Sequence, residues 1–181
     1  MARTPAQMRL RDFSRSLPMS LLKAREAVMS HFRPSLNHFG ITEQQWRVLR
    51  ALSAVETIEI MALAERTFLL PPSLSRILKD LDERGLIVRR TSETDLRRGL
   101  VSISARGRDL IDKAGAHSEA IYLEMTERYG ADKLARLQDM LRDLEAALAA
   151  PMEASALPKR GAAKARRPKA RLVKGGKTAA V

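Results

Sequence analysis

The chain has 181 residues, which is enough for one ordinary domain with an appendage and enough to bury a core without metal ions or disulfides. It contains no cysteine, and this excludes disulfide bonds, thiol catalysis and cysteine-based zinc sites. The formal net charge of +12 favours a polyanionic partner, and no stretch of sequence is long and apolar enough to predict a membrane span.

The positive charge is concentrated at the C-terminal end. Residues 151–181 hold nine Lys or Arg and one acidic residue, a net charge of +8, whereas residues 1–150 hold 24 Lys or Arg against 20 acidic residues. The composition of residues 151–181 predicts a disordered basic tail. Residues 1–16 are polar, lack the apolar region of a signal peptide and are expected to form a flexible N-terminus, which favours a cytoplasmic protein.

Two helices are expected in the first part of the domain. Apolar residues at helical spacing predict a helix from Leu17 to about Phe39, which Gly40 ends. Pro34 lies inside this segment and predicts a kink or a break near Arg33. Thr42 is followed three residues later by Gln45, a capping box that predicts a second helix from Glu43 to about Ala54.

The middle of the chain predicts helix, helix, strand, loop and strand. A small helix is expected over Glu59–Arg66. The next, from Pro71 to Arg84, begins with prolines, which a first helical turn tolerates, and stops at Gly85. Leu86–Arg90 and Leu100–Ser104 are short strand candidates joined by a basic loop.

Two long helices complete the expected domain of residues 17–150. Ser104 can cap a helix that runs to about Arg128, and leucines at three- and four-residue spacing predict a last helix over Asp132–Ala149. The expected fold is mainly α with a small β-hairpin wing, that is, a winged helix-turn-helix.

The helix over residues 71–84 has an apolar face and a face of hydroxyl and cationic side chains. A helix that enters the major groove of DNA needs such small polar and cationic groups. We expect Ser73 and Arg76 to contact base edges or the backbone. Lys79 is expected to bind phosphate, and Ser75 to meet a phosphate near the helix N-terminus. A solvated amphipathic helix has the same two faces, and the adjoining hairpin with its basic loop favours DNA contact.

Arginines dominate the predicted wing. Arg97 and Arg98 at its tip suit a narrow minor groove. At its base, one of Arg89 and Arg90 should face DNA, and we assign Arg89. Asp95 is either a turn residue or a group that orients a nearby arginine; the Asp-Leu-Arg order favours the second interpretation.

Several runs of sequence are similar to known regulators. Three runs resemble the signature of the MarR family of bacterial regulators: Gly85-Leu86-Ile87-Val88-Arg89, then Asp95-x-Arg97, then Val101-Ser102-Ile103-Ser104-x-x-Gly107. Two further runs resemble one subgroup of this family, the homoprotocatechuate-degradation operon regulators: Ala24-Arg25-Glu26-Ala27 and Glu43-Gln44-Gln45-Trp46-Arg47. The resemblance covers nearly all of residues 17–149. It implies a homodimer, a palindromic operator in double-stranded DNA, repression, and release by a small aromatic acid such as a hydroxyphenylacetate. The basic tail has no counterpart in the family pattern.

The first and last helices offer apolar faces for a second copy. The leucines of the last helix, together with Leu21, Val28 and Phe32, exceed what one small winged domain needs to cover. These helices either pack on each other within one chain or form a dimer contact. The resemblance favours a dimer formed through the terminal helices.

A cation lies on the apolar stripe of the first helix, either as one member of a structural ion pair or as a group that binds a ligand. Arg25 is in line with Leu21 and Val28, where an unpaired buried charge would be costly. Arg25 therefore has three alternative roles. It pairs with a carboxylate such as Glu26 of a partner helix, it extends its charged end to water, or it binds the carboxylate of an aromatic acid.

Five other residues complete the candidate effector site. Trp46 is either an aromatic wall or a core residue, and Arg47 offers a second cation. Met19 and Phe32 would supply apolar lining. His117 either lies isolated on its helix or forms a hydrogen bond with a phenol.

The sequence therefore predicts a sequence-specific DNA-binding regulator, a repressor of aromatic-compound catabolism genes, acting in the cytoplasm at the bacterial nucleoid. The alternatives are a related regulator of a stress or efflux operon with another phenolic ligand, and a non-specific architectural protein that binds nucleic acid. No enzyme, metal or cofactor is expected, because the sequence has no nucleophile–base pattern, Gly-rich phosphate loop or carboxylate cluster with ligand spacing.

Overall fold

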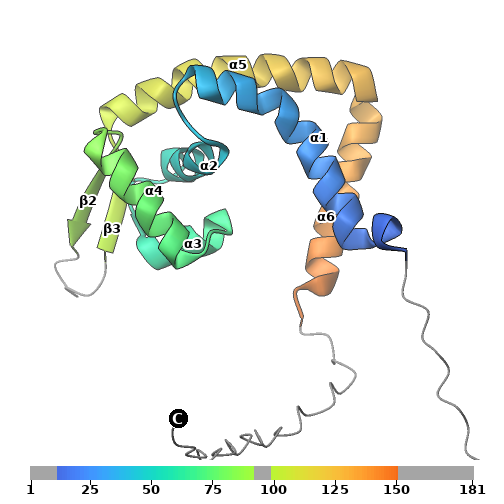
Figure 1. Ribbon diagram of the computed structural model, residues 1–181, viewed down its shortest axis with the longest axis horizontal. Helices are drawn as coiled ribbons and strands as arrows, with labels where there is room; N and C mark the ends of the chain where they lie inside the picture. Colours follow the sequence, from blue (N-terminus) through green and yellow to red (C-terminus); the bar gives the residue numbers. More distant parts are fainter. Residues whose placement is uncertain (1–11, 92–98, 151–181) are drawn as a thin grey trace, which may run out of the picture. The chain divides into compact units, whose positions relative to one another are not determined.

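The computed structural model of the chain describes residues 12–91 and 99–150 (Figure 1). The elements are η1 (Phe13–Arg15), α1 (Leu17–His38), α2 (Glu43–Ser53), β1 (Ile58–Glu59), α3 (Ile60–Thr67), α4 (Pro71–Glu83), β2 (Ile87–Thr91), β3 (Gly99–Ile103), α5 (Ala105–Tyr129) and α6 (Ala131–Leu148). Contacts divide the chain into two units, Met1–Leu134 and Ala135–Val181. Asp95, Arg97, Arg98 and the basic tail lie outside the described residues.

The predicted helices form, but Pro34 does not break the first of them. α1 continues through Pro34 to His38. The proline removes one backbone hydrogen bond from the helix interior. On either side of it, Phe32 and Leu36 are buried in the core, and we attribute the continuity of the helix to their packing. Gly40 follows with a φ of +65°, as a helix-ending glycine requires.

The predicted capping box at the start of α2 is confirmed. The Gln45 backbone N–H donates to Thr42 Oγ1 over 3.2 Å, and the Thr42 backbone N–H donates to Gln45 Oε1 over 2.7 Å. Ser104 similarly caps α5, because its Oγ accepts a 3.0 Å hydrogen bond from the Gly107 N–H. Local side-chain chemistry thus sets where both helices begin.

The sheet has one strand more than the sequence pattern predicts. β2 and β3 form the expected antiparallel hairpin, and the two-residue strand β1 pairs with the other edge of β3, so the order is β1-β3-β2. Two residues are too few to show the alternation of apolar and polar residues that marks a strand. β1 ties the start of α3 to the hairpin at Leu100 and Val101 of β3.

One apolar core joins the elements of the first unit. Leu49, Leu63 and Leu78 come from α2, α3 and α4, and all three are fully buried. Ile111 adds the N-terminal half of α5, which packs against both α1 and α2. Figure 1 shows the C-terminal part of α1 beside α5, with α2, α3 and α4 below α5.

α6 is amphipathic, and none of its residues is buried. Its exposed apolar side chains include Leu137, Met140, Leu141 and Leu148. Within the described ranges, no helix is long and apolar enough to cross a membrane.

Candidate functional site

The four predicted DNA-contacting residues of α4 share its exposed face. Three leucines of α4 are fully buried against the core, and they are Leu74, Leu78 and Leu81. Ser73, Ser75, Arg76 and Lys79 lie on the side of the helix away from these leucines, and all four are exposed. The helix therefore presents two hydroxyls and two cations on one surface while its other face holds it to the domain.

The start of α4 has an unusual set of backbone donors. Pro71 and Pro72 occupy its first two positions and have no N–H. The Leu74 N–H already donates to the Leu70 carbonyl, at 3.0 Å. Of the first three positions of α4, Ser73 is therefore the one with an N–H, and within the described residues this N–H has no hydrogen-bond partner.

Arg76 and Lys79 differ in their partners. Arg76 forms no hydrogen bond or ion pair with any residue that the structure describes. Lys79 Nζ lies 3.8 Å from Glu83 Oε1, but both side chains are mostly exposed, so this pair is worth at most about 1 kcal/mol. Neither cation is held away from solvent.

Asp80 is half-exposed and joins α4 to α2. Its Oδ2 accepts a 2.7 Å hydrogen bond from Gln45 Nε2 and lies 3.2 Å from Arg84 Nη1. Gln45 thus serves both the capping box and the position of α4. Arg84 Nη2 also donates to the Gly40 carbonyl at 3.0 Å, which joins the end of α4 to the α1–α2 turn.

The hairpin places both basal arginines on the surface. Arg89 and Arg90 are exposed on β2, opposite Val101 and Leu100 of β3. Successive residues of a strand point to opposite faces, so only one of the two arginines can share a face with the exposed surface of α4. The prediction for Arg89 stays open.

Several of the predicted effector residues line two adjoining cavities, one between α1, α2 and the turn after α3, and the other between α1, α2 and α5. We call the first the cationic lobe. It is open, has a volume of about 490 Å³ and is lined by Arg25, Met29, Glu43, Trp46, Arg47, Arg50 and Phe68. The apolar lobe has about 190 Å³ and is lined by Val28, Met29, Phe32, Trp46, Arg50, Gly115, Ser118, Glu119 and Tyr122. Met29, Trp46 and Arg50 belong to both.

Glu43 joins three arginines at the edge of the cationic lobe. Its side chain is only 14% exposed and forms ion pairs with Arg25, with Arg33 at 3.3 Å and with Arg47 at 3.1 Å. Arg25 and Arg33 also pair with Glu26. Arg25 therefore finds its carboxylates within its own chain, on α1 and α2.

The pKa of Glu26 is lowered, first by the hydrogen bond from Arg33 and then by the positive charges of Arg33 and Arg25. The carboxylate thus stays ionised to a lower pH than a free glutamate. The ionised carboxylate offsets part of the positive charge of Arg25 and Arg33.

Arg50 and Tyr122 are site residues that sequence reasoning missed. The Arg50 guanidinium carbon lies 5.7 Å from the centroid of the Trp46 ring, a cation–π contact, and Arg50 has no ion pair with any described residue. The Tyr122 ring meets Phe32 edge-on, with centroids 5.1 Å apart. The four-residue spacing of Trp46 and Arg50 on a helix is a signal that would have found Arg50.

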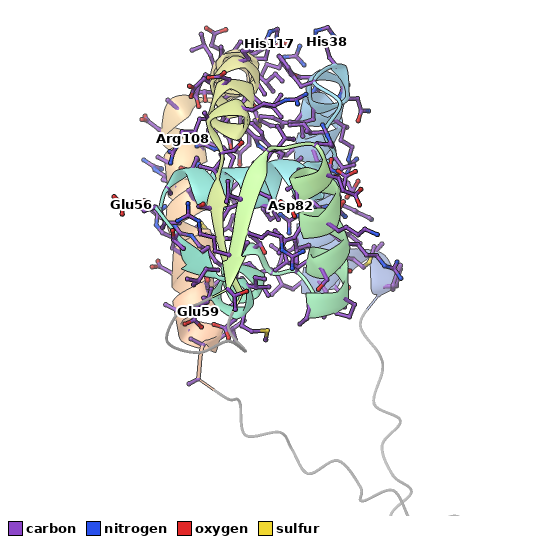
Figure 2. All side chains as sticks on the ribbon, turned by 90° about the vertical axis from the view of Figure 1, so that its left-hand side faces the viewer. His38, Glu56, Glu59, Asp82, Arg108 and His117 are labelled. Carbon is purple, nitrogen blue, oxygen red and sulfur yellow. The ribbon has the colours of Figure 1, made fainter. Side chains whose placement is uncertain are left out.

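Met19 and His117 line neither lobe. The His117 ring lies against Phe39 with centroids 5.2 Å apart, and Phe39 in turn meets His38 at 5.3 Å. Figure 2 shows both histidines at the top of the view, His38 as the last residue of α1 and His117 in the middle of α5. Both histidines are exposed.

The outward helix α4, the short helix α3 before it and the β2–β3 hairpin after it define a winged helix-turn-helix. The chain belongs to the MarR family, whose sequence pattern matches residues 39–98. It is 35% identical to the homoprotocatechuate degradative operon repressor of Escherichia coli over 128 residues, which are 71% of this chain and 86% of that protein. The predicted fold class and the predicted resemblance are confirmed.

Two solved structures have the same fold. NadR in complex with 4-hydroxyphenylacetate has a TM-score of 0.65 and 36% identity, covering 76% of this chain and 97% of that one. The transcriptional repressor CouR bound to a 23-mer DNA duplex has a TM-score of 0.68 and 25% identity, covering 77% and 99%. This chain is therefore a MarR-family transcriptional regulator, and its relatives include a repressor of an operon for the degradation of an aromatic compound.

Proposed function

We propose that this protein is an operator-binding repressor of aromatic-compound catabolism genes, and that a small aromatic acid in the two-lobed cavity releases it from DNA. Family membership supports DNA binding, as does the DNA duplex bound to the similar protein CouR. The exposed Ser73, Arg76 and Lys79 would contact the major groove, and Arg89, with Asp95, Arg97 and Arg98, the adjoining groove. Acting on bacterial DNA, it would work in the cytoplasm, without enzymatic activity.

A homodimer is part of this proposal. Winged helices of this kind read two half-sites about 34–36 Å apart, which requires two copies. Exposed apolar side chains on three helices are available for a second copy: Leu17, Leu21 and Leu22 on α1, Leu123 and Tyr129 on α5, and Leu137, Met140 and Leu141 on α6. Burying such groups between copies would be favourable.

The observation that carries the ligand proposal is Arg50, a guanidinium over the Trp46 ring at the junction of the two lobes with no carboxylate partner among the described residues. An aromatic ring would lie in the apolar lobe near Phe32 and Tyr122. Its carboxylate would bind Arg50, and Glu119 would repel a carboxylate placed in the apolar lobe itself. The 4-hydroxyphenylacetate bound to NadR has this combination of ring and carboxylate.

Footprinting and ligand titration test the proposal together. Purified protein on promoter fragments should give a sharp, palindromic footprint, and adding 4-hydroxyphenylacetate, phenylacetate or benzoate should remove it. Arg50→Gln should keep the footprint but need at least about tenfold more ligand to lose it, because a charge-assisted hydrogen bond is lost.

Arg108→Gln is the matched control. Arg108 is an exposed arginine of α5 that lines neither lobe (Figure 2), and its loss should not change the ligand response. Smooth coverage of DNA without a preferred site would instead indicate an architectural protein. A footprint that none of the aromatic acids removes would contradict the assignment of the ligand.

A further inference from the structure

Arg47 forms a link between the cationic lobe and the start of α4. Its Nη2 lies 3.1 Å from Glu43 Oε1, and its Nη1 donates a 3.0 Å hydrogen bond to the Thr67 carbonyl. Thr67 is the last residue of α3 and is buried. Its carbonyl is among those at a helix end that have no donor within the helix, so Arg47 supplies one.

The residue after Thr67 adopts a backbone conformation that side chains disfavour. Phe68 has φ 51° and ψ 41°, in the left-handed region, and is the non-glycine residue with positive φ among the described residues. Its side chain is 83% exposed and lines the cationic lobe, so core packing does not fix it. Such a turn has alternatives close in energy and persists only where its surroundings hold it.

An anion in the cationic lobe would compete for Arg47. A guanidinium has five N–H donors in a planar fork, and a ligand carboxylate matches that fork better than one backbone carbonyl does. If Arg47 turns toward the ligand, the Thr67 carbonyl loses its donor. The turn at Phe68, which leads directly to Leu70 and α4, then loses one of the contacts that hold it.

We propose that Arg47 is a positioning residue that couples occupancy of the cationic lobe to the α3–α4 turn, and so to the exposed face of α4. The coupling runs from ligand to Arg47, from Arg47 to the Thr67 carbonyl, and from there to the Phe68 turn. It rests on the proposed function, because it concerns how the same ligand regulates DNA binding. A ligand shifts such an equilibrium only if it binds the two states differently, and the exchange of Arg47 partners provides that difference.

Arg33 provides a matched control. It pairs with the same Glu43 as Arg47 does, but it lines neither lobe and has no bond to α3. Arg33→Gln and Arg47→Gln therefore remove one Glu43 partner each, and only the second removes the link to Thr67. Trp46 is the single tryptophan of the chain and lines both lobes, so its fluorescence reports ligand binding.

The first experiment needs no ligand. Amide hydrogen exchange at residues 68–70 should become about fivefold faster in full-length Arg47→Gln, the change expected for one lost hydrogen bond, and should not change in Arg33→Gln. Equal exchange in the wild type and Arg47→Gln would overturn the proposal, even if no aromatic acid acts on the protein. Failure of every aromatic acid to act on the protein would instead count against the proposed function alone.

The second experiment measures coupling. The operator Kd is determined with and without saturating 4-hydroxyphenylacetate, and the ratio is compared between variants. The wild type and Arg33→Gln should show the same ratio, whereas Arg47→Gln should still quench Trp46 but have a ratio close to one. A wild-type ratio in Arg47→Gln would overturn the proposal. So would complete loss of ligand binding in that variant, because the proposal has Arg50 hold the carboxylate and Arg47 add only a further contact.

Discussion

Arg50 differs from the other arginines around the cavity in having no carboxylate partner among the described residues. Arg25, Arg33 and Arg47 converge on Glu43, and two of these three also pair with Glu26. Arg50 would exchange only water for a ligand carboxylate, whereas Arg47 would have to give up its hydrogen bond to the Thr67 carbonyl. Position on the same cavity therefore does not give these cations the same role.

Arg76 of α4, like Arg50, has no carboxylate partner among the described residues. If it reads a guanine edge, Arg76→Ala should cost about 1–3 kcal/mol for the operator at one base pair and relax the preference there. Operator variants in a gel-shift titration measure this. An equal loss on random DNA would show a phosphate contact instead.

The lowered pKa of Glu26 leads to a pH-dependent contribution to stability. Because the pKa is lower in the folded protein than in the unfolded chain, the stabilisation is present at neutral pH and is lost as pH falls below about 4.3 and through the folded pKa. Glu26→Gln should therefore have a lower melting temperature than the wild type at pH 7, and the difference should shrink below pH 4. A difference that does not depend on pH would argue against the ion pairs as its source.

At the scale of elements, the approach of α5 to the strand region depends on Gly107. A Cβ at this position would lie 2.1 Å from the backbone oxygen of Leu86, which cannot move as a side chain can. Gly107→Ala should cost roughly 1–3 kcal/mol of unfolding free energy, measured by denaturant titration. The same change at Gly115, where nothing lies within 4 Å, should be neutral or stabilising by up to about 1 kcal/mol. Equal effects at both positions would refute the packing argument.

Elements whose ends carry their own chemical signal could be predicted from the sequence. Thr42, Gln45 and Ser104 mark helix starts by side-chain hydrogen bonds that involve only neighbouring residues. Pro34 carries an equally local signal, but packing of Phe32 and Leu36 offsets it, and packing partners cannot be read from one segment.

The candidate site divides in the same way. The outward residues of α4 follow from helical periodicity, so their exposure could be predicted. The partners of Arg25 could not be predicted, because they depend on how α1 meets α2. Nor could the hydrogen bond that Asp80 accepts from Gln45, a residue 35 positions earlier in the chain. Tyr122 lies on α5, far in sequence from Trp46, and only the fold brings it to the apolar lobe.

At the scale of the whole molecule, the exposed apolar side chains of α6 predict self-association. Leu141→Asp should shift the protein toward a monomer in sedimentation experiments and weaken operator binding by at least about tenfold, because paired half-sites are then lost. Met61→Asp, at an exposed apolar position of α3, is the control for solubility effects. If Leu141→Asp sedimented as the wild type does, this face of α6 would not be the interface.

The charge of residues 151–181 predicts a further effect on DNA binding. Deleting them removes a net charge of +8 and should weaken binding to the operator and to random DNA alike. Each lost phosphate contact should reduce the slope of log K against log salt by about 0.9. A deletion that altered operator choice would indicate a specific role for this segment.

The two prolines at the start of α4 bear on how related regulators could diverge. Many helices hold a phosphate with several main-chain amides, which no exchange of side chains can remove. If α4 binds a duplex as proposed, Pro71 and Pro72 leave one amide among its first three positions, so binding would depend mainly on the replaceable side chains at positions 73, 75, 76 and 79. New operator preferences could thus arise through a few point substitutions, with the scaffold beneath them left intact.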